Sequence, residues 1–320
     1  MNNAVTVPET GAHSLSGSAL LTANRQICVV IPTYNRVDRL RMLLSQLSTQ
    51  VIPKGYDLLP LVVNDGSPDD TEQMLRKEFP FYFFLTGPGS WWWTKSVNEG
   101  MKYALMHFHP DYFLFLNDDS QLSSGYLLKL MKASETAGAN SIIASLSVND
   151  TLPHQVSFSG VRSINWRTLK KETYHKNFEL LEHLPSSGLV PTYALNGRGT
   201  LISAGIIQKL GFLNERAFPQ YGSDDDLALR AWEKGIPVLL SYSCHVYDSL
   251  HDTSRGNPFR QDPLPVFIKS FFTWHSVNYI PKQFRFFSRH GIRILLPFYM
   301  VKFIGGTAYA YFFKYKKTTP

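Results

Sequence analysis

Acidic side chains directly follow two apolar runs of this 320-residue chain. Asp118 and Asp119 come after the run 112–116, and Asp65 follows the run 58–63. Mg²⁺ prefers oxygen ligands and commonly takes one or two carboxylates together with substrate phosphates. In a neighbouring pair on extended chain, one acid can reach a metal while the other points toward a sugar hydroxyl. The pattern indicates a metal-bridged nucleotide ligand, with an aspartate turn or helix cap as the plainer alternative.

A second acidic cluster, Asp224 to Asp226, opens a helix that we expect at 224–234. A positioned carboxylate can accept the proton of an attacking hydroxyl while a metal neutralises a leaving phosphate. We take Asp224 as the candidate base and Asp225 as a partner of the helix dipole, a role that is also the alternative for Asp224. Arg230 could orient these acids, touch phosphate or form an ordinary surface pair.

Short apolar runs alternate with helical periodicity, which is typical of a parallel sheet covered on both faces. The expected strands are 27–32, 58–63, 81–85, 112–116, 141–146, 198–203 and 236–241. The expected helices follow residues 36, 70, 93 and 223. The fold class is therefore α/β, with an open, mostly parallel sheet flanked by helices.

Ligands of open α/β sheets bind beyond the carboxyl ends of the strands, so the residues at those ends are the site candidates. The first strand ends in Pro32, Thr33, Tyr34, Asn35 and Arg36. No GxGxxG follows it, and no GxxxxGK[ST] occurs in the chain, which disfavours dinucleotide and P-loop sites.

Three successive tryptophans, 91–93, follow the loop Gly87-Pro88-Gly89 and precede a helix. Aromatic faces stack on sugars and bases. We expect one of the three to be buried, and Trp92 and Trp93 to line the donor or acceptor pocket. Core packing of all three is the alternative.

The net charge of +7 is confined to one end of the chain. Residues 263–320 hold nine of the 32 basic residues, no acidic residue and 16 of the 44 aromatics, so the remainder has 23 basic against 25 acidic. A near-neutral body argues against nucleic-acid binding.

A membrane span at 294–313 would place Lys302 near its middle, at a cost of about 2.5–3.5 kcal/mol. We therefore expect this segment to lie on an anionic membrane surface, with a helix packed on the body as the alternative.

The chain thus divides into a flexible leader (1–24), a nucleotide-sugar half (25–125), an acceptor half (126–262) and a basic aromatic tail (263–320). Residues 25–262 form one catalytic domain in this division. Cys28 and Cys244 are expected as buried thiols in a reducing compartment.

Four segments in order resemble the family 2 glycosyltransferases, which have the GT-A fold. They are VVIPTYNR, VVNDGSPDDT, FLFLNDDS and YGSDDDLALRAW. The segment WWTKSVNEG is similar to one of the rhamnosyl- and galactofuranosyltransferase-like subgroup. The resemblance covers about residues 26–250.

The resemblance implies a role for each matching residue. The nucleotide-sugar donor would contact Pro32, Thr33, Tyr34, Asn35, Arg36, Asp65, Trp92, Trp93, Asn98, Asn117 and Asp118. Asp119 would bind Mg²⁺ or Mn²⁺ as part of the DxD motif, in which Asn117 replaces the first acid. Asp224 and Asp226 would match the ED-x-D pattern, in which Ser223 replaces the glutamate. Gly197 would lie on the acceptor-side wall, and His251 is a further candidate metal ligand, although His245 and His251 also suit structural roles.

The expected function is metal-dependent, inverting transfer of one sugar to a glycan or lipid-linked acceptor in cell-surface polysaccharide synthesis. The QxxRW pattern of processive synthases is absent, which favours single addition. The enzyme would act in the cytoplasm on the inner face of the cell membrane. A non-catalytic relative that binds nucleotide-sugar and anchors an assembly is the alternative, kept open by Ser223 and Asn117.

Overall fold

The computed structural model describes residues 5–6, 24–248 and 262–314. Most of the expected leader lies outside these ranges, but Val5–Thr6 (β1) pairs with the edge of the sheet at Leu85 and Phe84. Val5 and Thr6 are thus strand residues, and the flexibility expected of the other leader residues stays a prediction.

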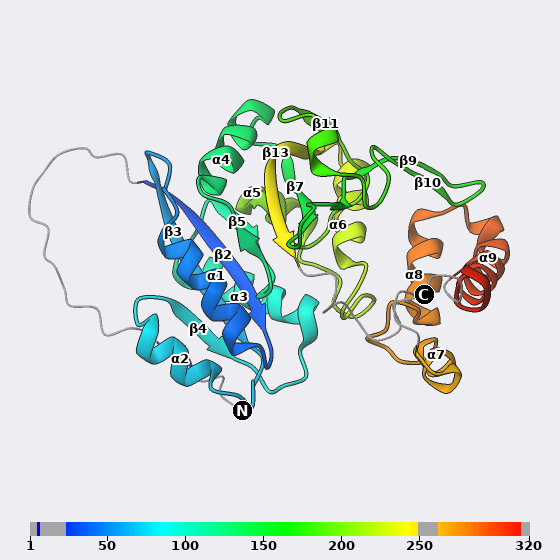
Figure 1. The fold of residues 1–320 in the computed structure, drawn as a ribbon, viewed down its shortest axis with the longest axis horizontal. Coiled ribbons are helices and arrows are strands. Elements are labelled where there is room, and N and C mark those ends of the chain that lie inside the picture. The colour runs from blue at the N-terminus through cyan, green and yellow to red at the C-terminus, as the bar shows by residue number, and fades with distance from the viewer. Residues whose placement is uncertain (1–4, 7–23, 249–261, 315–320) are drawn as a thin grey trace, which may run out of the picture.

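One large sheet forms the centre of the molecule (Figure 1), in the order β1-β4-β3-β2-β5-β12-β7-β13-β11. Its main strands are β2 (Arg25–Thr33), β3 (Tyr56–Asn64), β4 (Phe83–Thr86), β5 (Tyr112–Phe115), β7 (Ile142–Asn149), β12 (Thr200–Ser203) and β13 (Val238–Asp248). β4, β3, β2 and β5 run parallel, as do β7 and β13, while β12 is antiparallel to both of its neighbours. The α/β fold with an open sheet flanked by helices is confirmed.

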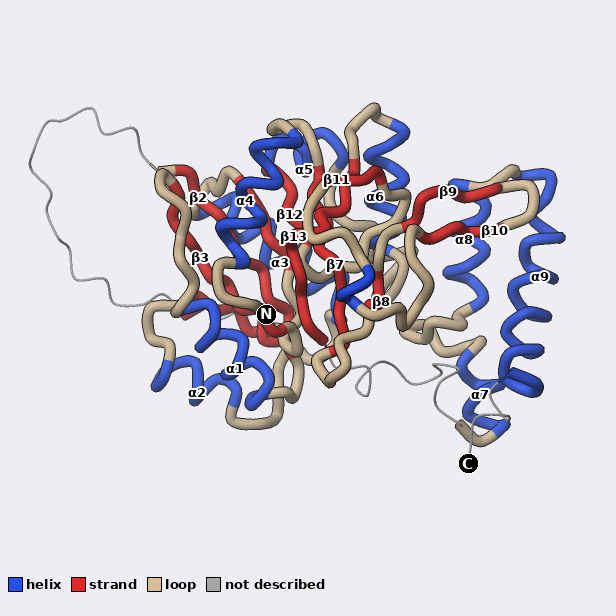
Figure 2. Tube along the Cα trace, turned by 45° about the horizontal axis from the view of Figure 1, so that its top comes forward, coloured by secondary structure: helices blue, strands red, loops and turns tan. Residues whose placement is uncertain are grey.

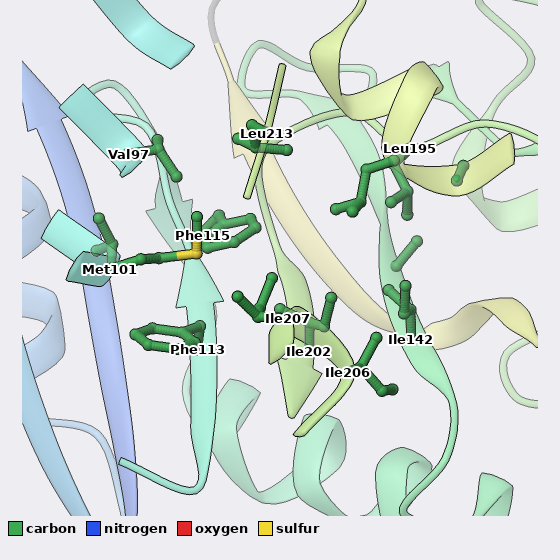
Figure 3. Close-up of a cluster of buried hydrophobic side chains, with 14 of the residues drawn as sticks. Val97, Met101, Phe113, Phe115, Ile142, Leu195, Ile202, Ile206, Ile207 and Leu213 are labelled. Atoms are coloured by element: carbon green, nitrogen blue, oxygen red, sulfur yellow. The ribbon is translucent and has the colours of Figure 1, made fainter. Parts of the chain in front are cut away.

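Helices cover both faces of the sheet (Figure 2). One face packs on α1 (Val37–Ser48), α2 (Thr71–Glu78) and α4 (Tyr126–Ala137). The other packs on α3 (Trp92–His107), α5 (Ala204–Leu210) and α6 (Ser223–Glu233). Figure 3 shows side chains of this second core, including Val97 and Met101 against Phe113 and Phe115.

The strand β2 shows why the sequence encodes two cores. Ile27, Val29 and Ile31 join the first core, whereas Cys28 and Val30 join the second, as expected from the two-residue side-chain period of a strand. The run is apolar throughout because both faces are covered.

Glycine permits the close approach of α3 to the sheet. A Cβ at Gly100 would lie 2.7 Å from Val30 Cγ1 and 2.9 Å from Val63 Cγ2. This packing fixes the helix that follows the tryptophans over β2 and β3.

Five short strands were not predicted from the sequence. β6 (Gln121–Leu122) follows β5, and the other four lie in the expected acceptor half: β8 (Val156–Phe158), β9 (Val161–Asn165), β10 (Lys170–Thr173) and β11 (Leu189–Pro191), with a 3₁₀ turn at Leu181–His183. β9 and β10 form a two-stranded antiparallel sheet separate from the central one.

The tail folds into α7 (Leu264–Ser270), α8 (Ile280–His290) and α9 (Leu296–Tyr309), with a 3₁₀ turn at Arg293–Leu295 and a π-helical end at Ala310–Lys314. In both views, α8 and α9 lie beside the β9–β10 hairpin (Figures 1 and 2). The hydroxyl of Tyr299 donates to the carbonyl of Trp166, and Lys302 donates to that of Thr168. The tail helices therefore pack on the body, as in the alternative above, and contact of the tail with a membrane surface stays a prediction.

The length of α9 also bears on the expected membrane segment. Among the described residues, no helix is both long enough and apolar enough to cross a membrane.

Candidate active site

The ends of β2 and β5 bring two carboxylates together with a hydroxyl and a guanidinium. Thr33 Oγ1 donates to Asp118 Oδ2 at 2.8 Å. Arg36 Nη1 lies 3.1 Å from Asp118 Oδ1 and 3.0 Å from Asp119 Oδ2. Both acids are buried, and burial raises the pKa of Asp118 to about 6, although the Arg36 charge opposes the shift. The ends of the first and fourth expected strands thus lie together.

The remaining oxygen of Asp119 fits a metal ligand. Its Oδ1 is buried and has no hydrogen-bond partner, a costly state for a carboxylate oxygen. A hard divalent cation would satisfy it, so Asp119 is the residue here that suits Mg²⁺ or Mn²⁺. Within the described ranges, no three His, Cys, Asp or Glu side chains are grouped closely enough to hold a metal ion. His251 lies outside the described residues.

Asn117 and Trp93 connect this edge to the second acidic cluster. Trp93 Nε1 donates to Asn117 Oδ1 at 2.8 Å, and the Trp93 amide donates to Gln220 Oε1 at 3.0 Å. The side-chain oxygen of Asn117 is thus engaged by the indole. Trp93 is partly exposed and lies between the Asp118–Asp119 edge and the Asp224–Asp226 cluster. A ligand that spans these two groups of acids could therefore contact its ring.

Gly197 lets the chain pass between Trp93 and Asp224. With φ at +53°, it occupies a left-handed conformation, and a Cβ there would lie 2.7 Å from Trp93 Cζ2. The same Cβ would be 3.5 Å from Asp224 Oδ2. The acceptor-side segment, the indole and the candidate base therefore meet at this point.

Asp224 has the protonation behaviour that a general base needs. Burial, followed by the charge of Asp225, raises the pKa of Asp224 to about 7. Its Oδ1 accepts the Asp225 amide at 2.9 Å. Asp225 itself pairs with Lys171 at 3.5 Å. A carboxyl with a pKa near 7 can both accept and release a proton at neutral pH.

Asp226 and Arg230 form a buried ion pair within α6, next to Asp224 and Asp225 in the chain. Arg230 Nε donates to Asp226 Oδ2 at 2.8 Å, and its other nitrogens donate to the carbonyls of Leu210 and Phe212. His290 and Arg289 of the tail also contact Asp226. Although burial opposes it, His290 and Arg230 together lower the pKa of Asp226. Arg230 is therefore occupied by these partners rather than open to a phosphate, and a supporting role of the pair stays a prediction.

Ser223, which stands where the family pattern has glutamate, is part of the core. Its buried hydroxyl lies 2.9 Å from that of Thr94. Position 223 therefore has a buried hydroxyl in place of the carboxylate of the family pattern.

Asp65 anchors the tryptophan loop. Its carboxylate accepts the amides of Gly89, Trp91 and Trp92 at 2.7–3.1 Å. Contact of Asp65 with a base or ribose stays a prediction.

Two other residues expected at the donor have different roles. Asn98 is buried and holds the loop after α5, donating to the Leu213 carbonyl and accepting the Leu213 amide. The expectation that Asn98 contacts the donor is corrected, because its amide is committed to this loop.

Trp92 is stacked on His275 of the tail, with centroids 4.1 Å apart, so this ring face is covered rather than open to a sugar. Trp91 is the buried member of the three.

The turn after β2 has an exposed outer part. Pro32 and Thr33 are buried strand residues, whereas Tyr34 is 51% exposed and Asn35 donates its amide to Ser67 Oγ. Tyr34 is therefore the side chain of this turn that can stack on a base.

His245 has a structural role. A ring nitrogen lies 2.7 Å from the Tyr242 carbonyl, and burial lowers the pKa of His245.

Residues of the tail were missed as neighbours of the site. Lys282 is buried, and burial lowers its pKa to about 8 even though Asp224 and Asp225 oppose the shift. Charge complementarity could have indicated this contact, because the tail has basic but no acidic residues and the body carries the acidic cluster Asp224–Asp226.

The chain matches known proteins in sequence and fold. The family model described as "Glycosyl transferase family 2" matches residues 28–194. The low-salt glycan biosynthesis hexosyltransferase Agl10 of Haloferax volcanii is 20% identical over 228 residues, 71% of this chain and 67% of Agl10.

Solved structures share the architecture. GalNAc-T7 with UDP, GalNAc and Mn²⁺ has a TM-score of 0.57 at 12% identity over 90% of this chain, which spans 57% of that chain. The mannosyltransferase PcManGT of Pyrobaculum calidifontis with GDP-Man and Mn²⁺ has a TM-score of 0.53 at 14% identity, over 91% of this chain and 73% of that chain. At these identities the likeness establishes the fold.

Proposed function

The chain belongs to glycosyltransferase family 2, and we propose that it moves one sugar from a nucleotide-diphosphate sugar to an acceptor hydroxyl. The observation that carries the proposal is Asp224, with a pKa near 7, separated from the Asp118–Asp119 edge by Trp93 and Gly197. The neighbours with bound UDP, GDP-Man and Mn²⁺ support a nucleotide-sugar donor and a divalent metal for this chain.

The residues divide the reaction between two ends of the site. Asp224 accepts the proton of the acceptor hydroxyl while its oxygen attacks the anomeric carbon. The bond from that carbon to the diphosphate oxygen breaks, and the nucleoside diphosphate leaves with the bonding electrons. Asp119, with Asp118 beside it, would hold Mg²⁺ or Mn²⁺, which neutralises charge on the departing diphosphate. Attack from the face opposite the leaving group inverts the anomeric centre.

The finer assignments extend the proposal. We place the chain in the rhamnosyl- and galactofuranosyltransferase-like subgroup, acting as a hexosyl- or deoxyhexosyltransferase on a glycan or lipid-linked acceptor of cell-surface polysaccharide. Residues 25–262 would be the catalytic domain and 263–320 a membrane-associating region, on the cytoplasmic face of the cell membrane. Exposed apolar side chains on the tail support this location: Ile294, Phe298, Val301 and Ile304.

A donor screen tests the function. UDP-, dTDP- and GDP-sugars are added with Mn²⁺, Mg²⁺ or EDTA, and the melting temperature and sugar transfer are measured. One donor should stabilise the protein only with metal, and Asp224→Asn should bind it normally but fail to transfer. Full transfer in EDTA would overturn the metal role.

A non-catalytic nucleotide-sugar-binding relative is the second candidate. It is favoured by the buried Ser223 and by Asn117, whose oxygen is engaged by Trp93. This candidate would be supported if the wild type and Asp224→Asn both bind the donor, and neither protein transfers the sugar or hydrolyses the donor.

A further inference from the structure

A cavity of about 490 Å³ lies between the body and the tail. The β9–β10 hairpin, the residues before α6, and the helices α8 and α9 form its walls. Most of the wall is apolar and aromatic, with contributions from Trp166, Leu169, Phe218, Phe286, Phe287 and Phe303. The volume is in the range of small-molecule sites.

The polar groups of this cavity are mainly cationic. Lys171, Lys282 and Lys302 line it, and among its described lining residues Asp225 is the only acidic one. Lys282 Nζ donates to the Val277 carbonyl at 2.8 Å and lies 5.5 Å from the Tyr221 ring centroid. The site therefore combines an apolar wall with an excess of positive charge.

The cavity adjoins the candidate base. Gly222 and Asp225 line it, and Asp224 stands between them in the chain at the start of α6. Asp224 is also the acid near Gly197, since a Cβ on Gly197 would lie 3.5 Å from Asp224 Oδ2. A ligand whose head reaches the first turn of α6 would thus present its hydroxyl to Asp224.

The outer wall continues into exposed apolar surface. On α9, Lys302 and Phe303 line the cavity, while the neighbouring Val301 is 71% exposed. An apolar chain could therefore pass from a membrane surface into the cavity along α9.

We propose that this cavity binds the lipid part of the acceptor, a lipid phosphate that carries at its head the sugar whose hydroxyl faces Asp224. The chain would pack on the aromatic wall, and the lysines would bind the phosphate. A bare glycan fits poorly, because its hydroxyls would lose water against an apolar wall. The proposal rests on the proposed function and selects the lipid-linked acceptor among its alternatives.

Titration calorimetry of the full chain with farnesyl phosphate, below its micelle concentration, tests the proposal. Farnesol and inorganic phosphate serve as probes of each half of the ligand. Farnesyl phosphate should bind at least about tenfold more tightly than either, a difference of about 1.4 kcal/mol. Equal binding of farnesol would overturn the proposal.

Two variants place the ligand. Val277→Trp fills the cavity and should weaken farnesyl phosphate binding about tenfold or more, whereas Ile268→Trp, an exposed position on α7, should not. Lys302→Met should weaken it several-fold, whereas Lys269→Met should have no effect. Unchanged binding in Val277→Trp would overturn the site.

Donor binding separates this proposal from the enzymatic one. If nucleotide-sugars bind and Val277→Trp changes neither farnesyl phosphate binding nor transfer, the cavity assignment fails alone. If farnesyl phosphate binds in the cavity but no nucleotide-sugar binds, the proposed function fails and the lipid site stands.

Discussion

His290 Nε2 lies 2.9 Å from Asp226 Oδ1, so a buried side chain of the tail contacts the helix that presents Asp224. The other ring nitrogen of His290 lies 3.2 Å from Glu233 Oε1, on the same helix. Phe286, one turn earlier on α8, packs on Phe218. The tail therefore packs directly on α6, which carries the candidate base.

We predict that His290→Ala lowers the free energy of unfolding by about 1–3 kcal/mol, because it leaves part of a buried carboxylate without its partner. Urea unfolding measures the loss. His183→Ala, whose side chain is 59% exposed, should change stability little. Equal stability of the two variants would show that the tail does not support α6.

The pH dependence of transfer should report Asp224. The base must be deprotonated to accept a proton, so kcat/KM should rise with pH through about 7. Asp224→Asn should lower kcat by about 10²–10⁴-fold. Asp225→Asn is the matched control: it should keep activity but move the rise to lower pH, because the Asp225 charge raises the pKa of Asp224. A shift to higher pH would contradict the assignment.

The strand-end rule accounts for what the sequence could predict. Thr33, Asp118 and Asp119 meet because parallel strands place their carboxyl ends at one edge, and this follows from the order of apolar runs. The contacts of Asn98 could not be predicted, because its partner Leu213 is 115 residues away in a loop without periodicity.

The contacts of the tail with the body could not be predicted from local sequence patterns either. Its aromatic residues suit a membrane and a protein interface equally, so composition could not distinguish Trp92 stacking on His275 from Trp92 stacking on a sugar. Deciding between these partners requires the arrangement of three distant segments.

Arg36 supplies the cation for Asp118 and Asp119 in the structure. We predict that Arg36→Gln destabilises the metal-free protein by about 1–3 kcal/mol, because two buried carboxylates then face each other without it. Mn²⁺ should raise the melting temperature of Arg36→Gln more than that of wild type.

Arg41→Gln is the control for this experiment, since Arg41 on α1 contacts Asp38 of the same helix and Glu78 at the end of α2, both at the surface. Its response to Mn²⁺ should equal that of wild type. An Arg36→Gln protein that Mn²⁺ does not stabilise would contradict a metal site at Asp119.

Gly197→Ala should be destabilising by about 1–3 kcal/mol, because the new methyl group would meet the Trp93 ring and the residue would keep a positive φ. Transfer should fall with it, as Trp93 and Asp224 are displaced. Gly205→Ala provides the contrast: this helical position has no atom within 4 Å of the added Cβ, so stability should rise by about 0.5–1 kcal/mol. Thermal unfolding of the two variants compares them, and equal effects would contradict a steric role for Gly197.

Membrane contact through α9 is testable with a pair of equally exposed residues. Val301 on α9 and Met106 on α3 are both 71% exposed. Val301→Asp places an acid on a surface that we propose faces anionic lipid, so co-sedimentation with phosphatidylserine vesicles should fall several-fold. Met106→Asp should leave it unchanged, and raising the salt concentration should weaken binding of wild type by screening the lysines and arginines of the tail. Equal sedimentation of both variants would exclude α9 as the contact, and the apolar side chains on it would then need a protein partner.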